Sequence, residues 1–242
     1  MFSIVKHGVP YNFIETGLTQ TDKWLRDNFA IWEPFTFEVF EKVANAEKLA
    51  VDIGAWIGLT GIWLSKHFKH VIAVEADPKA VESLERNLNA SGCKNVTIIP
   101  HPLFHKKQRV YFGPNKHVSG ATLNDSMCQL KDNWTHPQDI SMDALTLTDV
   151  LPEASQIGFI KCDIEGGEEV ILEELVSFSK KHAIPLLLSF HIWWWREGNI
   201  RRFSSLFDTE KTQYFTDGFQ SVVDPVSYLE STPMGTLFFR PI

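Results

Sequence analysis

The sequence predicts an α/β fold with a mostly parallel central sheet and helices on both of its faces. From residue 49 onward, short apolar runs alternate with amphipathic helical stretches, which is the pattern of strand–helix–strand units. Two of these runs, residues 159–163 and 186–191, are almost continuously apolar. Strands with this composition are typical of parallel sheets that are buried on both sides.

The first half of the chain supplies three strands and two helices in regular order. We expect strands at residues 49–53, 71–75 and 96–99, with helices at about 58–68 and 78–90. Asp77 is a candidate N-cap with Pro78 in the first helical position, and Ser91-Gly92 ends the second helix. Residues 100–145 break the alternation with turn signals such as Gly113-Pro114, which predicts an elaborated segment near a ligand.

The second half resumes the alternation and closes the fold. A strand at 159–163, a helix at 167–180 and a strand at 186–191 should be followed by antiparallel pieces near 213–222 and 235–240. Residues 1–45, with a helix-like stretch at 22–29, are expected to form an N-terminal cap over the ligand. At 242 residues the chain is read as a single domain whose core is residues 46–242.

Composition excludes several classes of protein. The formal net charge of −7 lacks the basic footprint of nucleic-acid binding, so no nucleic-acid partner is expected. Cys93, Cys128 and Cys162 have no CxxC spacing, which indicates a reducing compartment. No stretch reaches the roughly 20 apolar residues of a membrane span, and the first ten residues show no signal-peptide pattern. We therefore expect a soluble cytoplasmic protein without a membrane partner. The sequence does not predict its oligomeric state.

A glycine-containing loop after the first strand predicts a nucleoside site. Residues 52–58 read Asp-Ile-Gly-Ala-Trp-Ile-Gly, at the end of a strand and the start of a helix. Glycines allow the backbone to approach a ligand, and a helix N-terminus attracts an anion such as the carboxylate of S-adenosylmethionine (SAM). A nicotinamide enzyme would carry GxGxxG, but three residues separate Gly54 from Gly58. The spacing favours SAM.

An acidic residue lies at the end of the second strand, beside the glycine-containing loop that follows the first strand. Glu75 ends that strand, 17 residues after Gly58, where a carboxylate can accept hydrogen bonds from both hydroxyls of a ribose. The expected cofactor-binding residues, which include the loop, the region after the third strand and the N-terminal cap, are Asp52, Gly54, Ala55, Gly58, Glu75, Ala76, Leu103 and Glu33.

These motifs resemble the FkbM family of SAM-dependent methyltransferases over about residues 33–191. The matching pieces are Trp32-Glu33-Pro34, the loop at 52–58, residues 74–78, residues 142–145 and, above all, residues 160–168, Ile-Lys-Cys-Asp-Ile-Glu-Gly-Gly-Glu. The resemblance implies a Rossmann-like class I methyltransferase fold and O-methylation of a small molecule or glycan, often at a sugar hydroxyl. Many members have Asn and Glu where this chain has Trp56 and Ser189, so the roles of those residues are not carried over. The chain looks more like a subgroup with Gly-Ala-Trp-Ile-Gly and Ser-Phe-His.

The candidate catalytic residues are His191 and Asp163. Both end strands of the predicted sheet, at the edge where ligands bind in such folds. An imidazole with a pKa near 6.5 suits a general base, and Asp163 is the alternative. A third interpretation has Asp163, Glu165 and His191 hold a divalent cation, Mg²⁺ or Mn²⁺, that acidifies the acceptor hydroxyl. A fourth makes Asp163 a hydrogen-bond acceptor and Glu165 a helix N-terminal charge.

The acceptor is expected to lie against Trp193, Trp194 and Glu165. Flat aromatic faces after His191 could stack on a sugar ring, while other tryptophans of the run 193–195 pack against a helix starting near Asn199. Alternative functions are a non-catalytic nucleoside-binding module of a glycan-building protein and a methyltransferase for a non-sugar small molecule. No Asn-Pro-Pro-Tyr or Asp-Pro-Pro-Tyr tetrapeptide of base or amide methyltransferases is present.

Overall fold

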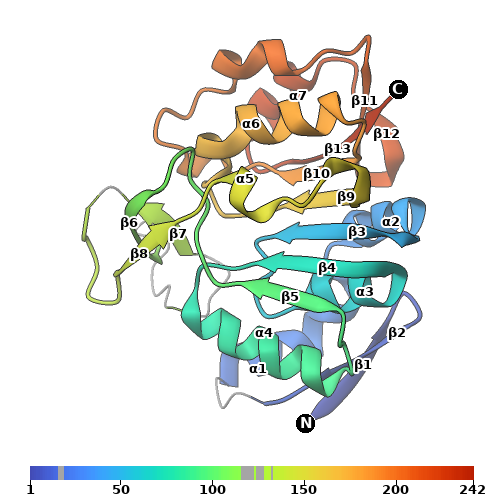
Figure 1. Cartoon of the computed structure of the whole chain (residues 1–242), viewed down its shortest axis with the longest axis vertical. Helices are drawn as coiled ribbons and strands as arrows, with labels where there is room; N and C mark the ends of the chain where they lie inside the picture. Colours follow the sequence, from blue (N-terminus) through green and yellow to red (C-terminus); the bar gives the residue numbers. More distant parts are fainter. Residues whose placement is uncertain (16–18, 116–122, 124–127, 132) are drawn as a thin grey trace.

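A central eight-stranded sheet forms the core of the chain (Figure 1). The structure is a computed structural model that describes residues 1–15, 19–115, 123, 128–131 and 133–242. The strands run in the order β12-β11-β13-β10-β9-β3-β4-β5. This order places the first two strands of the glycine-loop unit, β3 and β4, next to each other, with only β5 outside them at that edge.

Five neighbouring strands of this sheet are parallel, and the C-terminal edge is antiparallel. The parallel strands are β3 (Asn45–Ile53), β4 (Phe68–Val74), β5 (Val96–Ile99), β9 (Ile157–Cys162) and β10 (Leu186–Ser189). The edge is built from β13 (Thr236–Pro241), β11 (Thr212–Thr216) and β12 (Gln220–Ser221). The predicted mostly parallel sheet with an antiparallel edge is confirmed.

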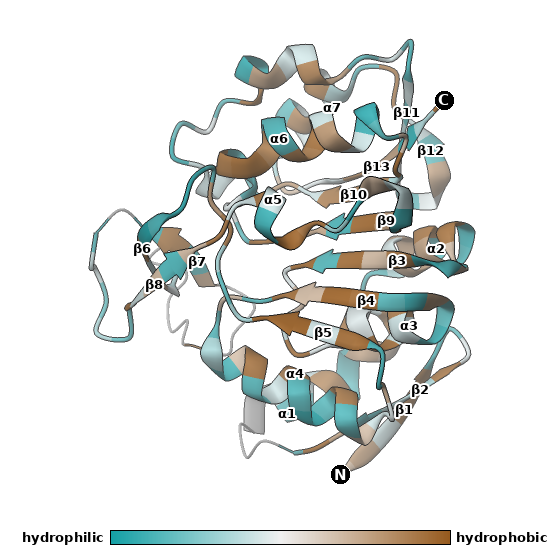
Figure 2. Ribbon diagram, viewed as in Figure 1, coloured by the Kyte–Doolittle hydropathy of each residue, from teal (hydrophilic) through white to brown (hydrophobic). Residues whose placement is uncertain are grey.

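The two faces of the sheet are covered by different helices, as alternation along the strands requires. In β10, Leu187 packs in one hydrophobic cluster while Leu186 and Leu188 pack in the other. The first cluster is covered by α2 (Pro34–Val43), α3 (Leu59–His67) and α4 (Pro78–Ala90). The second is covered by α5 (Leu147–Val150), α6 (Glu168–Lys181) and α7 (Pro225–Ser231). Figure 2 shows the apolar strands at the centre of the molecule.

The helix α4 begins as the sequence predicts. The side chain of Asp77 accepts hydrogen bonds from the backbone N–H groups of Lys79 and Ala80, at 2.7 and 3.3 Å. Pro78 occupies the first turn, where its missing N–H costs nothing. This cap fixes the chain that leaves β4 and so fixes the position of Glu75.

The N-terminal segment is more structured than the sequence suggests. A hairpin of β1 (Phe2–Lys6) and β2 (Val9–Phe13) precedes α1 (Thr19–Asn28) and the short helix η1 (Phe29–Ile31). Its aromatic side chains form a buried group in which Tyr11 and Phe13 both contact Phe29 edge-on. The hairpin and α2 were not predicted, because short strands and helices of this kind are stabilised by packing rather than by their own periodicity.

A second, three-stranded antiparallel sheet lies beyond the carboxyl ends of the parallel strands (Figure 1). It consists of β6 (Gln108–Pro114), β7 (Cys128–Lys131) and β8 (Ile140–Ala144). This sheet belongs to the elaborated segment 100–145, and part of that segment, including Ser119-Gly120, lies outside the described residues. Within the part of the chain that the structure describes, no helix is both long and apolar enough to cross a bilayer.

Candidate active site

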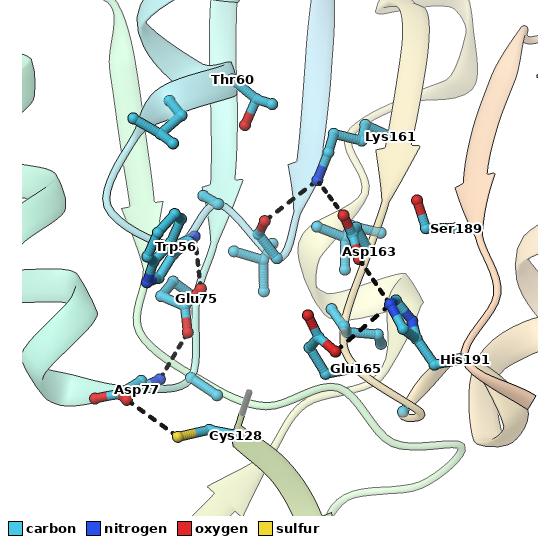
Figure 3. Close-up of a pocket in the computed structure, with 18 of the residues that line it drawn as sticks. Trp56, Thr60, Glu75, Asp77, Cys128, Lys161, Asp163, Glu165, Ser189 and His191 are labelled. Carbon is cyan, nitrogen blue, oxygen red and sulfur yellow. Dashed lines mark hydrogen bonds and ion pairs between the residues drawn. The ribbon is translucent and has the colours of Figure 1, made fainter. Parts of the chain in front are cut away.

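A cavity of about 730 Å³ opens at the carboxyl ends of β3, β4, β9 and β10. The N-terminal segment and the small sheet complete its walls, so segments far apart in the sequence surround one space. Figure 3 shows Glu75 and Trp56 on one side of it and Asp163, Glu165 and His191 on the other. Ligands of open α/β sheets bind at this end of the strands.

Gly54 forms the floor of the cavity between β3 and β9. Its φ of +83° lies in the left-handed region, and a Cβ atom there would lie 1.7 Å from the carbonyl oxygen of Asp163. Its N–H donates to the carbonyl of Val74 at 2.9 Å, which ties the loop to β4. Only glycine fits this position, because both the φ angle and the close backbone contact exclude a side chain.

Glu75 is held by the backbone on both of its oxygens. The N–H of Trp56 donates to Oε2 at 2.7 Å and the N–H of Asp77 donates to Oε1 at 2.8 Å. Burial raises the pKa of Glu75 to about 7, although these hydrogen bonds oppose the shift. Each carboxylate oxygen has a second lone pair, so the side chain can still accept hydrogen bonds from a ligand in the cavity.

An apolar wall lies beside Glu75. Ala76 and Leu103 line the cavity here, together with Phe112 and Leu130 of the small sheet. Cys128, at the start of β7, donates through Sγ to Oδ2 of Asp77 at 3.5 Å (Figure 3). The small sheet is therefore attached to the same residue that caps α4, and a flat apolar group such as adenine fits between these walls.

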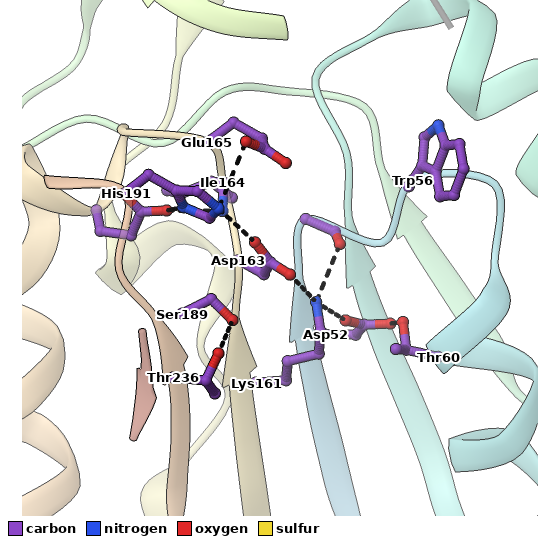
Figure 4. A network of polar contacts seen from close by, with 12 residues as sticks. Asp52, Trp56, Thr60, Lys161, Asp163, Ile164, Glu165, Ser189, His191 and Thr236 are labelled. Carbon is purple, nitrogen blue, oxygen red and sulfur yellow. Dashed lines mark hydrogen bonds and ion pairs between the residues drawn. The ribbon is translucent and has the colours of Figure 1, made fainter. Parts of the chain in front are cut away.

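Beneath the loop, Lys161 joins two carboxylates (Figure 4). Its Nζ lies 3.6 Å from Oδ1 of Asp52 and 3.7 Å from Oδ2 of Asp163, and it donates to the carbonyl of Gly54 at 3.4 Å. Burial alone would lower the pKa of Lys161, but Asp163 and Asp52 raise it well above its ordinary value. Asp52 is fully buried and accepts a hydrogen bond from Thr60 at 2.6 Å. Lys161 thus holds the ends of β3 and β9 together.

His191 is surrounded by three carboxylates. Its Nδ1 lies 2.8 Å from Oε1 of Glu168, and its Nε2 lies 3.7 Å from Asp163 and 3.5 Å from Glu165. Burial would lower the pKa of His191, but Glu168 and the other two carboxylates raise it to about 10. The three carboxylates therefore favour the protonated form of the imidazole in the ligand-free protein. Burial raises the pKa of Glu165 to about 8.

Glu168 fixes this cluster from below. The side chain is fully buried at the start of α6 and accepts hydrogen bonds from the N–H groups of Ile164 and Gly166, at 3.1 and 2.9 Å. The indole Nε1 of Trp195 donates to its second oxygen at 3.3 Å. The orientation of His191 therefore depends on a carboxylate with no access to solvent.

The N-terminal segment closes the cavity with aromatic side chains. Trp24 contacts Trp32 and Trp56 edge-on, with ring centroids 6.0 and 5.9 Å apart, and all three line the cavity. Glu33 also lines it, and burial, together with the charge of Asp163, raises the pKa of Glu33 to about 7. Glu33, Trp56 and Glu165 have φ values of +45°, +45° and +54°. Left-handed backbone at side-chain-bearing residues costs about 1–2 kcal/mol each, and strain of this kind concentrates at functional sites.

Most of the expected site residues line this cavity, but four do not. Gly54, Ala55, Glu75, Ala76, Leu103, Glu33, Asp163, Glu165 and His191 are on its wall. Asp52 and Gly58 lie behind the loop, where Asp52 binds Thr60 and Gly58 packs against Leu84.

The tryptophans expected to bind the acceptor lie elsewhere. Trp193 is 72% exposed and lines a separate shallow hollow. Trp194 stacks on the His191 ring, with centroids 5.2 Å apart and planes at 6°. Trp195 packs edge-on against Phe203, as the prediction of a helix contact for part of the run requires. Neither Trp193 nor Trp194 therefore lines the main cavity.

The sequence interpretation missed Lys161 and the tryptophans at positions 24, 32 and 56. Lys161 had a visible signal, because it is the one charged residue inside an otherwise apolar strand, and such residues are buried only with partners. Trp32 and Trp56 lie in the motifs at 32–34 and 52–58. Trp24 had no signal, because only the packing of the N-terminal segment brings it to the strand ends.

Comparison with known proteins identifies the family. The model described as the methyltransferase FkbM domain matches residues 52–205. The tRNA/tmRNA (uracil-C(5))-methyltransferase of Saccharophagus degradans is 31% identical over 93 residues, a match that covers 38% of this chain and 24% of that protein. The chain thus spans about a quarter of the length of this relative.

Solved structures show the same fold. An rRNA methylase from Streptococcus thermophilus aligns with a TM-score of 0.51 at 11% identity, covering 88% of this chain and 98% of the other. The methyltransferase FkbM of Methylobacillus flagellatus aligns with a TM-score of 0.48 at 18% identity, covering 80% of this chain and 43% of the other. The predicted class I methyltransferase fold is confirmed by the first alignment. The family match extends over more than half of the sequence, and the chain belongs to the FkbM methyltransferase family.

Proposed function

We propose that the chain is a SAM-dependent O-methyltransferase whose acceptor is a hydroxyl group of a sugar or glycan. The observation that carries the proposal is the single cavity that joins Glu75 on one side to Asp163, Glu165 and His191 on the other (Figure 3). The first side suits the ribose of a nucleoside cofactor. The second supplies polar groups of the kind that hold and deprotonate a hydroxyl.

The charge of the cavity supports SAM as the cofactor. Glu33, Glu75, Asp163 and Glu165 all line it, against two cationic side chains, Lys161 and His191. SAM carries a positive sulfonium and a positive ammonium group, and a positive charge nearby favours the ionised form of these carboxyl groups. Gly54 and Ala55 lie at the cavity floor, where the methionine part would lie.

When bound, SAM supplies a methyl group that is transferred to an acceptor oxygen as the bond from carbon to sulfur breaks. The residues of the chain position that oxygen in line with the methyl carbon, about 3 Å away, and exclude competing water. The tryptophans at 24, 32 and 56 provide the water-excluding wall. The hydroxyl proton leaves to a side chain on the acceptor side of the cavity, for which Asp163 and His191 are the candidates.

A sugar acceptor is supported by the combination of aromatic and polar lining. Sugars present apolar C–H faces to aromatic rings and hydroxyls to polar side chains. The cavity offers aromatic rings in the tryptophans at 24, 32 and 56, and polar side chains in Ser189, Glu165 and His191. The tryptophans that serve this role in the proposal are those of the N-terminal segment rather than Trp193 and Trp194.

Nucleic acid is not part of the proposal, although two of the similar proteins are named for RNA methylation. The lining is acidic and the net charge is −7, whereas phosphate-backbone binding needs clustered lysines and arginines. A non-sugar hydroxyl compound and a non-catalytic module are the remaining alternatives.

The proposal is tested by incubating the full chain with isotopically methyl-labelled SAM and a panel of sugars, polyols, phenols and tRNA. We expect mass spectrometry to detect a methyl ether on members of the sugar or polyol set. A matched reaction with Glu75→Gln, which cannot accept both ribose hydrogen bonds, should show little product. Label on tRNA alone, or on no compound while SAM binds normally, would contradict the proposal.

A further inference from the structure

Three side chains of the cavity bring possible metal-ligand atoms close together. Each of Asp163, Glu165 and His191 offers a ligand atom, and these atoms all lie within 4.8 Å of one another. Nε2 of His191 is 3.7 Å from Oδ1 of Asp163 and 3.5 Å from Oε2 of Glu165, longer than direct hydrogen bonds of 2.7–3.2 Å. In Figure 4 both carboxylates point toward the same edge of the imidazole ring.

The outer contacts of this cluster fix its ligand atoms. Glu168, fully buried, lies 2.8 Å from Nδ1 of His191, so the imidazole must present Nε2 to the two carboxylates. A carboxylate on the far nitrogen of a histidine is the usual support of a metal ligand. Within the described residues, Oε2 of Glu165 is buried and accepts no hydrogen bond. Such an atom is normally satisfied in a folded protein.

The backbone that carries these residues is constrained by its packing. Glu165 and Gly166 have φ values of +54° and +93°, and a Cβ on Gly166 would lie 3.1 Å from Cβ of Trp194. Asp163 follows β9 directly and its N–H donates to Ile53 at 2.9 Å. The ligand atoms are therefore held before any ion arrives, which lowers the cost of binding one.

We propose that Asp163, Glu165 and His191 form a divalent-cation site, with Mn²⁺ or Mg²⁺ as its ion and Glu168 as the residue that orients His191. Carboxylate oxygens favour Mg²⁺ and Mn²⁺, whereas an imidazole favours transition metals. Mn²⁺ is a transition metal that carboxylates also favour, so it suits this mixed set of ligands. Binding requires the three atoms to move to about 2.0–2.1 Å from the ion, and the ion displaces the proton from Nε2 of His191.

The site also narrows the acceptor class, a step that rests on the proposed function. Three protein ligands on an octahedral ion leave three positions, and all three residues line the cavity. Two neighbouring hydroxyls of one molecule can occupy two of these positions and chelate the ion. A metal-bound hydroxyl loses its proton more readily. The proposal therefore favours a vicinal diol, as in a sugar ring, over an isolated alcohol.

The test is a titration of the full chain with Mn²⁺ alone, followed by electron paramagnetic resonance of the free ion. We expect one site per chain, lost in Glu165→Gln and in His191→Ala. Glu168→Gln should weaken Mn²⁺ binding by about 10–100-fold, as expected for a supporting carboxylate. Glu173→Gln, an exposed carboxylate of the same helix, is the matched control and should bind Mn²⁺ like the wild type.

A second titration keeps the outcomes separate. Each variant is also titrated with S-adenosylhomocysteine (SAH), so that a misfolded variant is recognised by the loss of both ligands. Normal SAH binding without any Mn²⁺ site in the wild type, or a Mn²⁺ site unaffected by Glu165→Gln and His191→Ala, would overturn the metal proposal alone. Absence of SAH binding with the Mn²⁺ site intact would instead overturn the cofactor part of the proposed function.

Discussion

Gly54 shows how a single residue sets the distance between the glycine loop and β9. Its Cα lies so close to Asp163 that an added Cβ would overlap the carbonyl oxygen, at 1.7 Å. Either the loop or the start of the acidic cluster would have to move. The position thus couples the cofactor side of the cavity to the acceptor side.

Gly54→Ala should destabilise the fold by about 3 kcal/mol or more, since it combines left-handed backbone with steric overlap in a packed region. Gly92→Ala is the matched control, because Gly92 also has a positive φ, +66°, but nothing lies within 4 Å of its added Cβ. Gly92→Ala should cost only about 1 kcal/mol. Urea unfolding of both variants measures the difference, and equal losses would contradict the overlap.

Glu75 gives the cofactor affinity a pH dependence. Its pKa is raised to about 7 in the free protein, so its contribution to folding is most favourable below the ordinary pKa of about 4.3 and is lost as pH rises towards 7. Ribose hydroxyls donate to the ionised form. SAH affinity should therefore rise as Glu75 ionises, and it should be about tenfold weaker at pH 6 than at pH 8.

Calorimetry of SAH binding across this pH range measures the effect. Glu75→Gln should bind weakly and with a flatter profile, and any remaining slope belongs to Glu33, whose pKa is also about 7. A wild-type affinity that does not change between pH 6 and pH 8 would contradict the role of Glu75 as the ribose acceptor.

At this scale the sequence predicts local chemistry well and side-chain exposure poorly. Gly54, Glu75 and Asp77 were identified because strand ends, turns and caps are set by neighbouring residues. The placement of Trp193 and Trp194 outside the cavity depends on the course of the chain after β10. That strand ends at Ser189, and a short turn, η3 (Ile192–Trp194), then carries Trp193 toward solvent.

The N-terminal hairpin acts on the site through Lys6. Its Nζ is buried and donates to the carbonyls of Phe29, Ala30 and Trp32, at 3.1, 3.2 and 2.6 Å. These carbonyls end η1 immediately before Glu33. Strand β1 therefore holds the turn that delivers Trp32 and Glu33 to the cavity.

Lys6→Met should lower the free energy of unfolding by about 2–4 kcal/mol, because it leaves three carbonyls without their donor. Lys69→Met, at an exposed lysine, is the control and should be near neutral. If the hairpin also positions the cavity wall, Lys6→Met should weaken SAH binding as well. Chemical denaturation and calorimetry measure the two effects, and unchanged stability would contradict this role of Lys6.

The elements of the core were predictable, and those of the walls were not. Apolar runs in the sequence predict strands β3, β4, β9 and β10. The N-cap and the apolar residues at helical spacing predict α4. The hairpin, α2 and the pairing of β6, β7 and β8 depend on contacts between segments far apart in the sequence, such as the pairing of Gln108 with Ala144. No local pattern encodes such a contact.

Across the whole molecule, a group of carboxylates lies around the cavity in which the proposed ligands would bind. Carboxylates gather around one cavity, while Lys161 and His191 hold them in place from below and from one side. A cationic cofactor and a divalent ion both relieve the mutual repulsion of these carboxylates. The arrangement of charge in this cavity therefore suits the cationic cofactor and the divalent ion of the two proposals.

The most direct test of this account is calorimetric titration of the full chain with SAH, in the wild type and in Glu75→Ala. The account predicts binding in the micromolar range to the wild type and its loss in Glu75→Ala, while Glu47→Ala, which removes an exposed carboxylate, binds like the wild type. Absence of SAH binding to the wild type, or equal binding to Glu75→Ala, would contradict the assignment of this cavity as the SAM site.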